Sequence, residues 1–126
     1  MTTVYVSIGN SDDKLTQQDW AEFYRKVNLL LRGNPAVKAV HGQWVSEPAS
    51  AWQNACWCVE LDAHAPAITR QLKGHLGVLA RRYRQDAIAW AECPATEFLP
   101  PADESEAPPR LPTEESTAAE PQNLRT

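Results

Sequence analysis

Trp52-Gln53-Asn54-Ala55-Cys56-Trp57-Cys58-Val59-Glu60-Leu61 is the stretch that decides the fold, because its side chains alternate with the period of a β-strand. One face of this strand would present Gln53, Ala55, Trp57, Val59 and Leu61 to a hydrophobic core. The other face would present Trp52, Asn54, Cys56, Cys58 and Glu60. This second set is too polar for a deep core and too apolar for free exposure, so we expect a central strand whose second face is covered by something else.

Five further segments around this strand show strand or helix periodicity. Strand patterns cover residues 3–8, 37–44 and 87–92, and helix patterns cover residues 17–32 and a segment that begins at Pro66. Thr16 is the expected N-cap of the first helix, and Gly42 is the expected site of a bulge in the second strand. Gly74 and Gly77 weaken the second helix, and we expect them to permit close packing against the sheet.

The resulting order, β-α-β-β-α-β, predicts one α+β domain of the ferredoxin-like sandwich type over residues 1–99. Its four-stranded antiparallel sheet would carry both helices on one face, with the first and third strands at the centre. The helix-free face would then show a mixed set of side chains: Tyr5, Ser7, Asn54, Cys56, Cys58, Ala87, Ala89 and Ala91. From residue 100 to residue 126, prolines alternate with acids, Ser and Thr, which predicts a disordered acidic tail.

Charge is distributed unevenly along the 126 residues. The net charge of −4 belongs entirely to residues 100–126, because residues 1–99 hold ten acids and ten bases. A neutral domain argues against binding to nucleic acid or to an anionic membrane. The sequence has no apolar run long enough to cross a bilayer and no signal peptide at its start, and free thiols are the simplest account of its three cysteines. We therefore expect a cytoplasmic protein.

Three segments together resemble a group of short actinobacterial and actinophage proteins that has no established activity. These segments are Gly9-Asn10-Ser11-Asp12-Asp13-Lys14-Leu15, Trp52-Gln53-Asn54-Ala55-Cys56-Trp57 and Arg82-Tyr83-Arg84-Gln85-Asp86-Ala87-Ile88-Ala89-Trp90. The resemblance covers residues 3–99. It implies a small, free-standing cytosolic protein of a phage or mobile element rather than a fragment of an enzyme.

The cysteines and histidines are the first candidates for chemistry. Cys56, Cys58, Cys93 and His41 are ligand types that suit zinc, but their spacing does not match a zinc knuckle. A nucleophilic cysteine needs a base beside it, and the sequence places no histidine next to a cysteine. We therefore predict three half-buried structural thiols, with no catalytic residue, no metal and no cofactor.

Arg81, Arg82 and Arg84 form the one basic cluster of the sequence, at the end of the second helix. Cations at a helix C-terminus complement the helix dipole, which explains the cluster without a ligand. Three guanidinium groups close together would also suit a phosphate, an acidic partner or the acidic tail of the same chain.

Trp44 and Trp52 flank the expected hairpin, and two arrangements of these side chains are open. Either they form an apolar patch with Tyr5 on the helix-free face, or they fold back over the first helix. The first arrangement leads to our main hypothesis, a non-enzymatic binding protein that covers this face by homodimerisation or by docking a protein partner. The binding residues would be Tyr5, Trp44, Trp52, Asn54, Cys56 and Cys58, with Arg81, Arg82 and Arg84 at the rim.

Two alternatives remain. Dimers of related sheets enclose a pocket in which small molecules react, and here Tyr5, His41, Trp52 and Asn54 would line such a pocket in a dimeric α+β-barrel-like enzyme. In the second alternative the acidic, proline-rich tail is the active segment and binds a basic partner.

Overall fold

The computed structural model describes residues 1–10, 12–47, 53–95 and 97–106. Two units are distinguished, Met1–Thr96 and the residues from Glu97 onward, and each is described by itself. The elements are β1 (Thr2–Gly9), α1 (Gln17–Gly33), β2 (Val37–Val45), β3 (Asn54–Leu61), α2 (Pro66–Arg82), β4 (Ala89–Cys93) and a short 3-10 helix, η1 (Glu104–Glu106). Trp52 and residues 107–126 of the expected tail lie outside the described residues.

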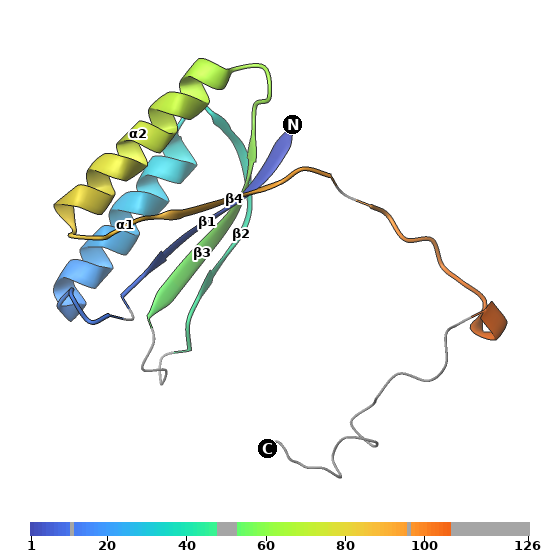
Figure 1. Ribbon diagram of the computed structural model, residues 1–126, viewed down its shortest axis with the longest axis horizontal. Coiled ribbons are helices and arrows are strands. Elements are labelled where there is room, and N and C mark those ends of the chain that lie inside the picture. Colours follow the sequence, from blue (N-terminus) through green and yellow to red (C-terminus); the bar gives the residue numbers. More distant parts are fainter. Residues whose placement is uncertain (11, 48–52, 96, 107–126) are drawn as a thin grey trace, which may run out of the picture. The chain divides into compact units, whose positions relative to one another are not determined.

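The four strands form one antiparallel sheet in the order β2-β3-β1-β4. Both helices cover the same face of this sheet (Figure 1). Strands β1 and β3 are the two central strands, and most of their helix-side residues are apolar and buried. The predicted α+β architecture, with a four-stranded antiparallel sheet and two helices on one side, is therefore present.

The core lies between the sheet and the two helices. The alternation predicted for β3 is confirmed: Ala55, Trp57, Val59 and Leu61 are buried on the helix side, and the indole N–H of Trp57 donates to Asn28 Oδ1 of α1 at 3.0 Å. The other buried apolar side chains of the sheet and helices on this side are Val4, Val6, Ile8, Phe23, Val27, Leu31, Leu72, Leu76, Leu79 and Ala80.

The connection between β1 and α1 is fixed by one buried amide. Asn10 is only 2% exposed, and its side chain accepts a hydrogen bond from the Leu15 backbone N–H and donates one to the Leu15 carbonyl. Its two local bonds close the loop and satisfy a polar group that would otherwise be costly to bury. One residue further on, Thr16 caps α1 as predicted, because its hydroxyl accepts from the Asp19 backbone N–H at 3.1 Å.

Helix α2 ends at Arg82 and is followed by a left-handed turn. The Gln85 N–H reaches back to the Ala80 carbonyl at 2.8 Å, and Arg84 takes a left-handed conformation with φ of 56°. Residues 83–88 are needed to complete this turn and to cross from the helix to the sheet. As a result β4 begins at Ala89, two residues later than expected, and Ala87 precedes the strand.

The expectation for Gly74 and Gly77 is wrong. A Cβ atom placed at either position would meet nothing within 4 Å, so no other element packs closely against these two glycines. Gly77 instead borders an open groove between α2 and β4. In the sheet, by contrast, the irregularity predicted near Gly42 is confirmed, since the register of β2 against β3 shifts between Val40 and Gly42.

Candidate functional site

The helix-free side of the sheet, here called the open face, carries the side chains that alternate with the core residues. Strand β1 contributes Thr3, Tyr5 and Ser7, and the register aligns Tyr5 with Cys58 on one side and Ala91 on the other. The other open-face residues are Ala39, His41, Gly42, Trp44, Asn54, Cys56, Glu60, Ala89 and Cys93. Most of these side chains are small or uncharged, as the sequence predicted.

Tyr5 and Trp44 form the centre of the open face. Their rings stack with centroids 6.4 Å apart and an interplanar angle of 27°, and their exposed fractions are 41% and 55%. Trp44 therefore lies on the open face and does not fold back over α1. The indole lies beside Gly42: a Cβ atom at that position would stand 3.8 Å from the Trp44 ring, at ordinary van der Waals distance.

The thiols lie around this aromatic pair. Cys58 is 7% exposed although it belongs to the helix-free side, and Cys56 is half-buried. The Cys58 thiol is the main cause that raises the pKa of the Tyr5 hydroxyl above its ordinary value, so this phenol stays protonated at neutral pH. Within the described part of the chain, no group of cysteines, histidines and acids is arranged to hold a metal ion.

One end of the open face is a polar corner around Glu60. The Thr3 hydroxyl donates to Glu60 Oε1 at 2.5 Å, and His41 Nε2 lies 3.2 Å from the same oxygen. The Thr3 hydroxyl, followed by His41, lowers the pKa of Glu60 below its ordinary value. Both donors point at one carboxylate, so Thr3 and His41 do not form the relay that would activate a nucleophile.

Asn54 lies at the opposite end of β3 from this corner. It aligns with Gly9, whereas Glu60 aligns with Thr3. Beside Asn54 is a hollow of about 350 Å³, lined by Ser7, Trp44, Cys56 and neighbouring residues. His41 does not line this hollow, so the structure does not bring together the amide and the imidazole expected in an enzymatic pocket.

The three arginines are not brought together either. Arg81 lines the groove between α2 and β4, whereas Arg82 lines a separate hollow between the two helices. Successive helical residues point about 100° apart, which separates these two guanidinium groups. Arg84, after the left-handed turn, donates to the Lys14 carbonyl at 2.9 Å. The predicted basic cluster is therefore three separate cations.

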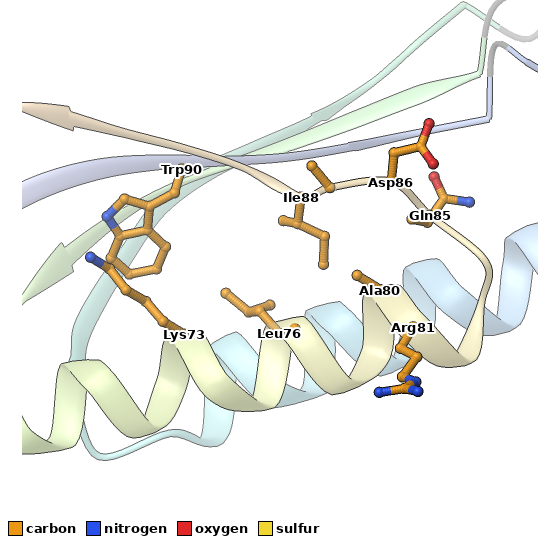
Figure 2. Close-up of a pocket in the computed structure, with 10 residues that line it drawn as sticks. Lys73, Leu76, Ala80, Arg81, Gln85, Asp86, Ile88 and Trp90 are labelled. Carbon is orange, nitrogen blue, oxygen red and sulfur yellow. The ribbon is translucent and has the colours of Figure 1, made fainter.

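The groove between α2 and β4 is the feature that sequence reasoning missed. It has a volume of about 640 Å³, and Arg81 is the one residue of its lining that the sequence predicts as a binding residue. Figure 2 shows Leu76 and Ile88 pointing into it from opposite sides, with Lys73 and Trp90 together at one end. The signal in the sequence was the stripe Lys73, Leu76, Gly77, Ala80 and Arg81, whose spacing places these residues along one side of the helix.

Comparison of the chain with protein-family models, with curated proteins and with solved structures gave no match. The resemblance to actinobacterial and actinophage proteins therefore stays a prediction, and so does a cytoplasmic location. Among the described helices, none combines the length and the apolar character needed to span a bilayer.

Proposed function

We propose that this chain is a non-enzymatic interaction protein and that two copies pair through the open face. We also propose that its domain is of the ferredoxin-like type. The βαββαβ order, the central β1 and β3 and the placement of both helices on one face support that assignment.

The stacked pair of Tyr5 and Trp44 is the observation that carries the proposed function. Aromatic side chains of this size stabilise an interface strongly when they become buried, and they are enriched where binding energy concentrates. In the described part of the chain, this is the one place where two large, partly exposed aromatic rings stack on the sheet. Burying both rings against a second copy removes apolar surface that would otherwise face water.

The shape and charge of the open face also support pairing with an identical copy. The bulky rings stand on β1 and β2, whereas β4 offers the small, exposed side chains Ala89 and Ala91. A two-fold axis that runs parallel to the strands, in the plane between two facing sheets, places β2 of one copy opposite β4 of the other. The rings of one copy then face the alanines of the other. The carboxylate of this face, Glu60, is already held by Thr3 and His41, so little uncompensated charge opposes burial.

Light scattering of the purified chain tests the proposal. We expect a mass twice the 14.0 kDa of one chain, and we expect Trp44→Glu to return the protein to a monomer by weakening association about 30-fold or more. Val78→Glu on α2 is the matched control, because Val78 has the same exposed fraction of 55% but lies away from the open face. This variant should remain a dimer.

Two results would contradict open-face pairing. One is a wild-type chain that is monomeric at every concentration tested. The other is a dimer that Trp44→Glu and Val78→Glu weaken equally. Circular dichroism of both variants separates loss of association from loss of folding.

A further inference from the structure

The outer edge of β4 is a second surface with binding capacity, and it does not depend on the open face. Strand β4 is the last strand of the sheet, paired with β1 on one side and with no described strand on the other. A strand in this position presents a row of backbone N–H and C=O groups that another extended chain can pair with.

The two edges of the sheet differ. Edge strand β2 breaks register with β3 twice, between Val37 and Ala39 and between Val40 and Gly42, and such bulges block the addition of a further strand. Edge strand β4 pairs with β1 through five consecutive residues without a shift. Its sequence, Ala89-Trp90-Ala91-Glu92-Cys93, contains neither the proline nor the lysine that commonly protects an edge.

A groove runs beside this regular edge. Leu76 and Ala80 of α2 form one wall, and Ile88 and Trp90 project from the β4 segment as the other (Figure 2). Alternate residues of a strand point to the same side of a sheet, so a strand added next to β4 would direct every second side chain into this groove. Its volume of about 640 Å³ accommodates several apolar side chains.

The charge of α2 indicates the chemistry of the occupant. The 17 residues of α2 include Arg70, Lys73, Arg81 and Arg82 and no acid. Lys73 and Arg81 border the groove itself, and Lys73 Nζ lies 4.9 Å from the centre of the Trp90 ring. Two acids lie near the groove: Asp86 on its rim is 3.4 Å from Lys14, and Glu92 of β4 is 3.9 Å from Lys73. The four bases of α2 outnumber these two acids by two. The surroundings favour a negatively charged partner.

We propose that the groove between α2 and β4 binds an acidic, extended peptide segment of a partner protein, which adds to β4 as a fifth strand. Backbone pairing along β4 supplies affinity, and the apolar side chains at alternate peptide positions enter the groove. Acidic residues at the groove-facing positions on either side of these apolar ones lie near Lys73 and Arg81. This site goes beyond the pairing of two copies through the open face and lies on a different part of the sheet.

Gly77 gives a direct way to close the groove. A Cβ atom at this position would meet nothing within 4 Å, so a larger side chain enters the groove without displacing the core. Gly77→Leu should therefore fold while filling the space that the peptide side chains need. Gly74→Leu is the matched control, because Gly74 lies in the same helix with the same free space but does not line the groove.

The experiment selects binders from a displayed library of random twelve-residue peptides against the full-length chain. We expect enriched peptides with apolar residues at alternate positions and acids at the two ends of this alternating series. Synthetic copies should bind the wild type and Gly74→Leu equally, and should bind Gly77→Leu about tenfold more weakly or worse. Amide resonances of residues 89–93 should shift on binding.

Three outcomes would overturn the proposal. They are a selection that enriches no peptide, enriched peptides that bind Gly77→Leu as well as the wild type, and enriched peptides that shift open-face resonances without those of β4. If Gly77→Leu fails to fold, the β4 variant Trp90→Ala tests the proposal instead. It removes the side chain at one end of the groove and should weaken binding of the same peptides.

Discussion

At the scale of single residues, the polar corner around Glu60 makes the folded state sensitive to acid. The lowered pKa of Glu60 means that the folded chain binds this proton less readily than the unfolded chain does. The stabilisation is therefore complete above the ordinary pKa of a glutamate and is lost as the pH falls through the lowered value. The Thr3 hydroxyl is the largest single cause.

Replacing that hydroxyl tests this account. Thr3→Val should raise the pKa of Glu60 toward its ordinary value, as measured by a carbon NMR titration of the carboxyl group. The free energy of unfolding of this variant should also fall less steeply than that of the wild type between about pH 5 and pH 3. Thr2→Val makes the same change on the neighbouring residue and should leave the pKa unmoved. An unchanged titration in Thr3→Val would refute the assignment.

At the scale of elements, α1 depends on its cap. Thr16→Ala removes the acceptor for the Asp19 N–H and should lower the free energy of unfolding by about 1 kcal/mol, measured by urea denaturation. Thr16→Ser keeps a hydroxyl in the same place and should lower the free energy of unfolding by only a small part of that amount. Equal losses in the two variants would show that the methyl group, and not the hydrogen bond, stabilises the start of the helix.

The strands and helices differ in how well their sequences predict them. β3 and α1 are predicted well, because Trp57 and its neighbours alternate strictly and Thr16 marks the start of the helix. The start of β4 is predicted poorly, because the number of residues between α2 and β4 depends on the left-handed turn at Arg84. Local patterns record which face of an element is apolar, but they do not record the distance to the next element.

The candidate sites show the same limit. The position of Tyr5 on the open face follows from alternation alone, whereas its stacking on Trp44 depends on the register of β2 after two shifts. The sequence placed Arg81 and Arg82 together because they are neighbours, although a helix turns them apart. The space beside Gly77 is a property of how α2 lies against β4, and no pattern within either segment reports it.

At the scale of the whole molecule, every buried apolar side chain identified lies between Val4 and Tyr83. The described residues 97–105 are exposed, and Phe98 and Leu99 are 88% and 79% exposed. A chain that ends at Leu99 should therefore keep the free energy of unfolding within about 0.5 kcal/mol of the full length. Parallel urea denaturation of the two chains measures this difference. A loss of more than about 2 kcal/mol would place part of the stabilising structure beyond residue 99.

The two edges of the sheet differ in regularity, and this difference also limits how many copies can join by strand pairing. A fibril grows when each added sheet offers a fresh edge equivalent to the one just used. Here a second copy that pairs its β4 with β4 of the first uses the regular edge of both chains and leaves only the shifted edges of β2 exposed. Strand addition therefore terminates after one step, and raising the protein concentration fills this position without lengthening the assembly.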